Sequence, residues 1–251
     1  MLLVADVHGA ADPLAQVVAQ TESLFVLGDL INFIDYRTNE GIVTDVCGSE
    51  FVAEMVALRT AGLSDEARTL WRSFSQGREV ELRDRYDALI DAAYDDVCSV
   101  LAGSGAFVTY GNVDHPDKLR SHLPPDCRFI EAEVVEVDGL AVGVVGGGLS
   151  SPLGVPGEVG DDVMAQRLSE IGPVDILCTH VAPAIDPLQM DVISGQPKGS
   201  VPLLEHLRQT QPRFHYFGDI HQPQAAQWMI GDTLSRNVGY FRATGRAVRH
   251  E

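Results

Sequence analysis

Five short apolar segments of this sequence are each followed at once by side chains that can bind a metal ion. These side chains are Asp6 with His8, then Asp29, Asn112, His180, and finally Asp219 with His221. Carboxylate, amide and imidazole groups suit borderline-hard cations such as Mn²⁺, Fe²⁺ or Zn²⁺. The set contains no cysteine, which disfavours a structural zinc site. The pattern therefore predicts a metal site built from oxygen and nitrogen ligands.

The apolar segments before these side chains are typical of short buried β-strands. We predict strands at 2–5, 23–28, 106–110, 174–178 and 213–217. The chain opens as strand, loop, helix, strand, and ligands of open α/β sheets bind beyond the carboxyl ends of the strands. Glycine precedes Asp29, Asn112 and Asp219, which suits sharp turns close to a bound ion. The five ligand segments are therefore expected to meet at one edge.

Other segments complete a single domain over residues 1–251. Apolar residues recur at helical spacing over 48–102, which predicts a helical insert broken at Gly62 and Gly77. We expect this insert at the rim of the site, as a lid, a wall or a partner surface. Residues 128–137 and 140–146 read as a β-hairpin. The glycines at 146–148 lack the Lys and Ser/Thr of a P-loop and are interpreted as a tight passage near the metals.

Composition limits the partners. The formal net charge is −18, which rules out a broad basic surface for binding nucleic acid or anionic membranes. Four dispersed cysteines fit reduced thiols. The first residues lack the basic region of a signal peptide, and no apolar stretch approaches the length of a membrane span. We therefore expect a cytoplasmic protein without membrane partners, and its oligomeric state stays open.

The five ligand segments, in this order, resemble the calcineurin-like metallophosphoesterase family. The pattern of that family is DxH, GDxxD, GNH(D/E), a lone H and GHxH, and the resemblance runs from Asp6 to His221. It implies an α/β fold, a four-layer α/β/β/α sandwich of two mixed sheets with helices outside. It also implies a hydrolase that acts on phosphoric ester bonds of a small phosphorylated substrate.

By position, the resemblance implies a role for each ligand. Asp6, His8 and His221 would bind one divalent ion, and Asn112, His180 and Asp219 the other. Asp29 would bridge the two ions, and Asp29 and Asn112 are counted among the catalytic residues. A hydroxide bridging the ions would attack phosphorus. Mn²⁺ and/or Fe are the expected cofactors, and Zn²⁺ is possible.

Three positions depart from the family pattern. Asn32 replaces the second Asp of GDxxD. Val113 replaces the GNH histidine and is followed by Asp114, an arrangement that resembles phosphodiesterase members of the family. Asp114 and His115 are therefore candidate catalytic residues, His115 as a substitute acid if its loop turns inward. Asp219 replaces the first histidine of GHxH.

Asp219 adds a negative charge to the site, which favours Mn²⁺ or Fe over Zn²⁺ and lowers the attraction for dianionic monoesters. Phosphodiesters are thus slightly favoured. Arg37, Lys198 and Arg242 are candidates to hold substrate phosphate. Two alternatives stay open: a binding scaffold with weak or no activity, suggested by the missing histidine, and a protein phosphatase.

Overall fold

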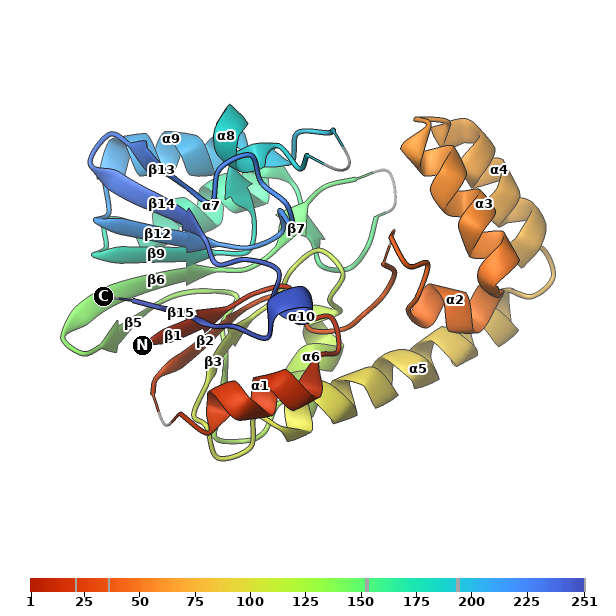
Figure 1. Ribbon diagram of the computed structural model, residues 1–251, viewed down its shortest axis with the longest axis horizontal. Helices are drawn as coiled ribbons and strands as arrows, with labels where there is room; N and C mark the ends of the chain where they lie inside the picture. Colours follow the sequence, from red (N-terminus) through yellow and green to blue (C-terminus); the bar gives the residue numbers. More distant parts are fainter. Residues whose placement is uncertain (21, 36, 152–153, 193–194, 251) are drawn as a thin grey trace.

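The computed structural model describes residues 1–20, 22–35, 37–151, 154–192 and 195–250. In this part of the chain the strands form two large mixed sheets that face each other, and helices cover the outer faces (Figure 1). The predicted α/β/β/α sandwich is confirmed. No helix in the described ranges is long and apolar enough to cross a membrane.

The first sheet carries the N-terminal ligand segments. Its order is β15 (Val248–Arg249), β1 (Leu2–Val4), β2 (Leu24–Leu27), β3 (Phe107–Thr109) and β4 (Arg128–Phe129). The strands β1 to β4 run parallel, and β15 pairs antiparallel with β1. The carboxyl ends of β1, β2 and β3 therefore lie at one edge of the sheet.

The second sheet carries the remaining ligand segments. Its order is β13 (Gln227–Ile230), β14 (Thr233–Asn237), β12 (Phe214–Phe217), β9 (Ile176–Thr179), β6 (Leu140–Val145) and β5 (Ala132–Val137). The strands β6, β9, β12 and β14 are parallel, whereas β5 and β13 are antiparallel edge strands. Two short pairs lie outside the large sheets: β7 (Gly148–Leu149) with β8 (Glu158–Val159), and β10 (Ala182–Pro183) with β11 (Gly199–Ser200).

The apolar strands bury both of their faces. In β1, Leu2 and Val4 belong to the core beneath the helices, whereas Leu3 belongs to the core between the sheets. Side chains alternate across a strand, so a strand buried on both faces needs an unbroken apolar run. This requirement explains why β1 and β2 are continuous apolar segments.

The outer layers are formed by helices. The first sheet is covered by α1 (Ala11–Val18), α5 (Glu79–Ser99), α6 (Pro116–His122) and the short α10 (Phe241–Thr244) (Figure 1). The second sheet is covered by α7 (Asp161–Ile171), α8 (Asp186–Gln189) and α9 (Val201–Thr210).

The segment expected as an insert has two parts. The helices α3 (Ser49–Thr60) and α4 (Ser64–Ser75), together with the preceding α2 (Ile42–Cys47), stand beside the sandwich in Figure 1. The chain breaks between α3, α4 and α5 fall at Gly62 and Gly77, as predicted. The helix α5 instead packs Ile90, Tyr94 and Val97 into the core beneath the first sheet. The helix α2 likewise buries Ile42 and Val46 in this core, so the outlying arm is α3 and α4.

The predicted strand at 128–137 is wrong as one element. Residues Arg128–Phe129 form β4 and pair with β3 in the first sheet, whereas Ala132–Val137 form β5 and pair with β6 in the second sheet. The chain crosses between the sheets around Ile130, which is buried in the core between them. The hairpin of β5 and β6 around Asp138-Gly139 is confirmed.

Candidate metal centre

The predicted ligands lie where strands of both sheets end. Asp6 follows β1, Asp29 follows β2 and Asn112 follows β3, while His180 directly follows β9 and Asp219 follows β12. Because these strands are parallel within their sheets, the turns after them share one edge of the sandwich. Residues more than 200 positions apart in the chain are thereby brought together.

The turns hold several ligands in left-handed backbone conformations. The φ angles are 56° at Asp6, 42° at His8, 53° at Asp29 and 63° at Asp219. Positive φ is uncommon outside glycine, although Asp, Asn and His tolerate it better than most residues. Strained backbone of this kind clusters at functional sites, where the surrounding structure holds it in place.

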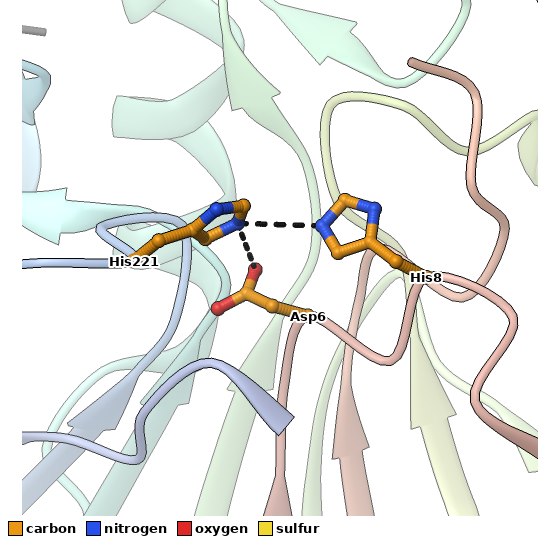
Figure 2. Close-up of side chains that lie close together, drawn as sticks. All are labelled: Asp6, His8 and His221. Atoms are coloured by element: carbon orange, nitrogen blue, oxygen red, sulfur yellow. Dashed lines mark hydrogen bonds and ion pairs between the residues drawn. The ribbon is translucent and has the colours of Figure 1, made fainter. Parts of the chain in front are cut away.

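Asp6, His8 and His221 form one group of mutually close ligand atoms. Nε2 of His8 lies 3.3 Å from Nε2 of His221, and the latter atom lies 3.8 Å from Oδ1 of Asp6. Figure 2 shows the two rings pointing toward each other from opposite sides, with the carboxylate beneath them. This group contains the residues that the resemblance assigns to the first ion.

Asp6, Asp29 and His180 form a second such group. Oδ1 of Asp29 lies 3.5 Å from Nε2 of His180, and Oδ2 of Asp29 lies 3.7 Å from Nε2 of His8. Nε2 of His180 also lies 3.2 Å from Oδ1 of Asn112. The two oxygens of Asp29 thus face histidines of different groups.

Asp219 is buried beside these groups but belongs to neither of them. Its backbone N–H donates to Oδ1 of Asp6 at 3.1 Å, and its carboxylate lies 4.0 Å from Nζ of Lys198. The backbone contact helps to orient Asp6. The role of Asp219 as a ligand stays a prediction.

The carboxylate of Asp114 is a buried anchor between two ligand loops. It accepts hydrogen bonds from the backbone N–H groups of Asp29 (2.7 Å), Leu30 (3.1 Å) and Gly111 (2.9 Å), and from the hydroxyl of Tyr94 (3.1 Å). A carboxylate with four donors is well suited to hold the turns after β2 and β3 together. A catalytic role for Asp114 stays a prediction.

His115 lies at the start of α6, outside both ligand groups. Its backbone N–H donates to the hydroxyl of Tyr94 at 2.7 Å, and its ring centre lies 6.4 Å from that of Phe33. Burial lowers the pKa of His115, and the side chains of Lys118 and Asp87, on α6 and α5, also act on it. A role of His115 in place of the missing histidine stays a prediction.

Two glycines allow the ligand loops to approach each other. A Cβ atom on Gly111 would lie 2.1 Å from Oδ1 of Asp29 and 2.5 Å from Nε2 of His180. A Cβ atom on Gly148 would lie 2.1 Å from Cβ of Asn112. The glycines at 146–148 thus form a close passage beside a predicted ligand, which agrees with their interpretation from the sequence.

The pKa values of the clustered side chains indicate a site with an excess of negative charge. Burial, together with nearby carboxylates, raises the pKa of Asp29 to about 7 and raises the pKa of Asp6. Burial alone would lower the pKa of His180, but Asp29, Asp6 and Asp219 raise it to about 9. Burial lowers the pKa of His221 to about 4 and also lowers that of His8, which keeps both imidazoles neutral and able to bind a metal.

The side chains present fit divalent cations. Oδ2 of Asp6 is buried without a hydrogen-bond partner among the described residues. Such an atom is costly unless another group satisfies it. A cation between Asp6, Asp29 and the neutral imidazoles would supply both the missing partner and the missing charge.

A cleft of about 150 Å³ opens beside this cluster. Its lining includes His8, His221, Asn32, Arg37, Lys198 and Tyr240. Two of the three predicted phosphate-binding cations therefore lie in the same cleft as the ligands. The third, Arg242, donates to the backbone carbonyl of His8 at 2.5 Å and pairs with Glu40 at 3.3 Å, so it supports the ligand loop.

Sequence reasoning did not find Tyr94 or Tyr240. Tyr94 holds Asp114 from α5, and the ring of Tyr240 stacks on His221 with ring centres 3.9 Å apart. Neither tyrosine belongs to a strand-end motif. Only tertiary packing brings them to the site, so the sequence held no local signal for either role.

No protein-family model and no curated protein matches this sequence. Solved structures do share its fold. One crystal structure is 15% identical, covers 96% of this chain and 90% of its own, and gives a TM-score of 0.59. TT1561 of Thermus thermophilus is 12% identical, covers 98% of this chain and 96% of its own, and gives a TM-score of 0.55. At these identities the likeness shows the fold alone.

A structure described as a novel archaeal phosphodiesterase is 10% identical and covers 97% of this chain and 85% of its own. Its TM-score of 0.37 is too low to carry an argument about this protein.

Proposed function

We propose that this protein is a metal-dependent phosphoesterase that favours phosphodiesters. The observation that carries the proposal is the position of Asp29. Its carboxylate faces His8 with Oδ2 at 3.7 Å and His180 with Oδ1 at 3.5 Å, one histidine from each group of ligand atoms, and Asp6 belongs to both groups. A shared carboxylate of this kind is what a pair of adjacent divalent ions requires.

The ligand sets proposed for the two ions are those that the resemblance implies, and the group of Asp6, His8 and His221 supports the first of them. Asp6, His8 and His221 would hold one ion, and Asn112, His180 and Asp219 the other, with Asp29 between them. Bound divalent ions supply a nucleophile at neutral pH and neutralise charge on the phosphoryl oxygens. Carboxylate and amide oxygens from Asp6, Asp29, Asn112 and Asp219 favour Mn²⁺ or Fe over Zn²⁺.

Other residues of the chain would bind and orient the substrate. Arg37 and Lys198 line the cleft beside His221 and would contact phosphoryl oxygens or a second anionic group. Asp114 would keep the turns carrying Asp29 and Asn112 in register. Because Asp219 lowers the positive charge of the site by one, the attraction for a dianionic monoester falls more than that for a monoanionic diester.

The test is turnover with defined metals. Protein stripped with EDTA and reloaded with Mn²⁺ should hydrolyse bis-p-nitrophenyl phosphate faster than p-nitrophenyl phosphate. Asp29→Asn should lower the rate by more than about 100-fold, the upper end of what changes to outer-shell partners of a metal cost. Asp12→Asn, which neutralises an exposed carboxylate on α1, serves as the matched control and should keep full activity.

A folded protein that binds Mn²⁺ but turns over neither ester, nor a phosphopeptide, would contradict the proposal and favour a binding scaffold. Turnover of the phosphopeptide alone would favour a protein phosphatase. Equal activity in Asp29→Asn and the wild type would contradict the proposed bridging role of Asp29.

A further inference from the structure

The three histidines of the candidate centre differ in what holds their rings. Nδ1 of His180 lies 2.8 Å from the carbonyl oxygen of Leu27. A hydrogen bond on the far side of an imidazole is the usual way to fix the orientation of a metal-binding histidine. The ring of His180 is therefore oriented by the backbone at the end of β2.

His221 has a different support. Its side chain is 27% exposed, against 6% for His8 and 0% for His180. In the described part of the chain, no hydrogen bond to its Nδ1 is found. Instead its ring stacks on Tyr240, with the ring planes 9° apart and the ring centres 3.9 Å apart. The same tyrosine meets His8 edge-on, with ring centres 5.6 Å apart.

The segment that carries Tyr240 is itself anchored to the ligand loops. The backbone N–H groups of Phe241 and Arg242 donate to the carbonyl oxygens of Ala5 (3.2 Å) and Asp6 (3.1 Å). Asn237 donates from Nδ2 to the carbonyl of Ile220 at 2.8 Å and accepts from the N–H of Gly239 at 2.6 Å. The segment is thus fixed to the turn before His221 and to the turn of Asp6.

The ring of Tyr240 is also held from the side of the cleft. Its hydroxyl donates to Oδ2 of Asp35 at 3.3 Å, and the guanidinium carbon of Arg37 lies 4.9 Å from the ring centre. Tyr240 is 7% exposed. Because the ring is buried and its segment is anchored through the backbone, it has little freedom to move even without the hydroxyl contact, and it can orient the imidazole stacked on it.

We propose that Tyr240 is a positioning residue that holds the imidazole of His221 in its metal-binding orientation by ring stacking. The inference rests on the proposed function, because it needs a metal bound by Asp6, His8 and His221. Aromatic stacking here takes the place of the outer hydrogen bond that His180 makes with the backbone. The ring, and not the hydroxyl, is the part of Tyr240 that this role requires.

The experiment measures Mn²⁺ binding to EDTA-stripped protein by isothermal titration calorimetry, without any substrate. Tyr240→Leu and Tyr240→Met remove the ring, whereas Tyr240→Phe keeps it and removes the hydroxyl. We expect the first two variants to weaken one of the two metal sites by about 10- to 100-fold and to leave the other within about threefold. Tyr240→Phe should bind both ions as the wild type does.

A matched control removes a stacked ring elsewhere. The rings of Phe25 and Phe107 stack with centres 4.8 Å apart at the start of β3, the end of that strand away from Asn112. Phe107→Leu should therefore lower stability without changing Mn²⁺ affinity. Circular dichroism identifies the folded variants, and the visible spectrum of Co²⁺-loaded protein should change in Tyr240→Leu and Tyr240→Met but not in Tyr240→Phe.

The outcomes separate the two proposals. Wild-type affinity at both sites in folded Tyr240→Leu or Tyr240→Met would overturn the positioning role and leave the phosphoesterase proposal standing. A loss in Tyr240→Phe as large as in Tyr240→Leu would also overturn it, because the hydroxyl would then carry the effect. A wild-type protein that binds no divalent ion would overturn both proposals.

Discussion

At the scale of single residues, Asp219 is a departure from the pattern that the sequence resembles, and it changes the charge of the candidate centre. Its backbone orients Asp6, and its carboxylate adds negative charge to a buried cluster next to Lys198. A unit charge at about 4 Å and an effective dielectric constant of about 20 interacts with another by about 4 kcal/mol. The identity of this side chain should therefore influence which phosphate esters are accepted.

We predict that Asp219→His raises the ratio of p-nitrophenyl phosphate turnover to bis-p-nitrophenyl phosphate turnover by about tenfold or more. A tenfold change corresponds to about 1.4 kcal/mol, which is well below the interaction energy of about 4 kcal/mol between two unit charges at about 4 Å. Asp219→Asn separates the effects, since it removes the charge without adding an imidazole and should shift the ratio in the same direction. An unchanged ratio in both variants would refute the charge argument.

At the scale of elements, the centre depends on how closely the turns after β2, β3 and β9 approach each other. Gly111 follows β3 and lies against both Asp29 and His180. Asp114, three residues further on, holds the turn after β2 through the N–H groups of Asp29 and Leu30. The turn after β3 is therefore the element that sets the spacing of the two ligand groups.

Gly111→Ala should displace Asp29 and His180, because its Cβ would lie 2.1 Å and 2.5 Å from their side-chain atoms. We expect at least about a 100-fold loss of Mn²⁺ affinity by calorimetry, with helix content unchanged by circular dichroism. Gly160→Ala is the control, since Gly160 precedes α7 with a φ of −72° and open space around it. Wild-type binding by Gly111→Ala would contradict this account of the turn.

At the scale of the whole molecule, the interior of the second sheet contains a buried polar chain that links three strands. The hydroxyl of Thr179 donates its one hydrogen to the carbonyl of Val181 at 2.7 Å. It must therefore accept the hydrogen bond from Nε2 of His215, at 2.9 Å. Nδ1 of His215 then accepts from the hydroxyl of Ser235 at 2.8 Å. The chain requires a neutral imidazole, and burial lowers the pKa of His215 to about 3.

This low pKa makes the fold sensitive to acid. An unfolded histidine titrates near pH 6.5, so the unfolded chain binds one proton more than the folded protein between about pH 6.5 and pH 3. Stability is therefore lost as the pH falls through this window, by about 1.4 kcal/mol per pH unit for one group. His215→Gln should remove this part of the slope, as measured by urea unfolding between about pH 6.5 and pH 4.5. Parallel slopes for the two proteins would contradict the assignment.

Much of the fold and of the site could be predicted from local patterns. The strands that end in ligand side chains are mostly apolar on both faces because each lies between a helical layer and the other sheet, and such burial leaves a clear trace in the sequence. The helix breaks at Gly62 and Gly77 could also be predicted locally, because glycine disfavours the interior of a helix. The crossing of the chain from β4 to β5 left no such trace, because both segments carry alternating apolar residues compatible with either sheet.

The sequence by itself determined which side chains can bind metal and in which order they follow their strands, because residue type and hydrophobic periodicity are local properties. Only the tertiary structure decided that the oxygens of Asp29 face different histidines, that α5 belongs to the core, and that Tyr240 stacks on His221. These features depend on the packing of segments far apart in the chain. Asp114 shows both sides. Its place two residues after Asn112 was visible in the sequence, but three of its four hydrogen-bond donors come from the turn after β2 and from α5, which only the tertiary structure brings to it.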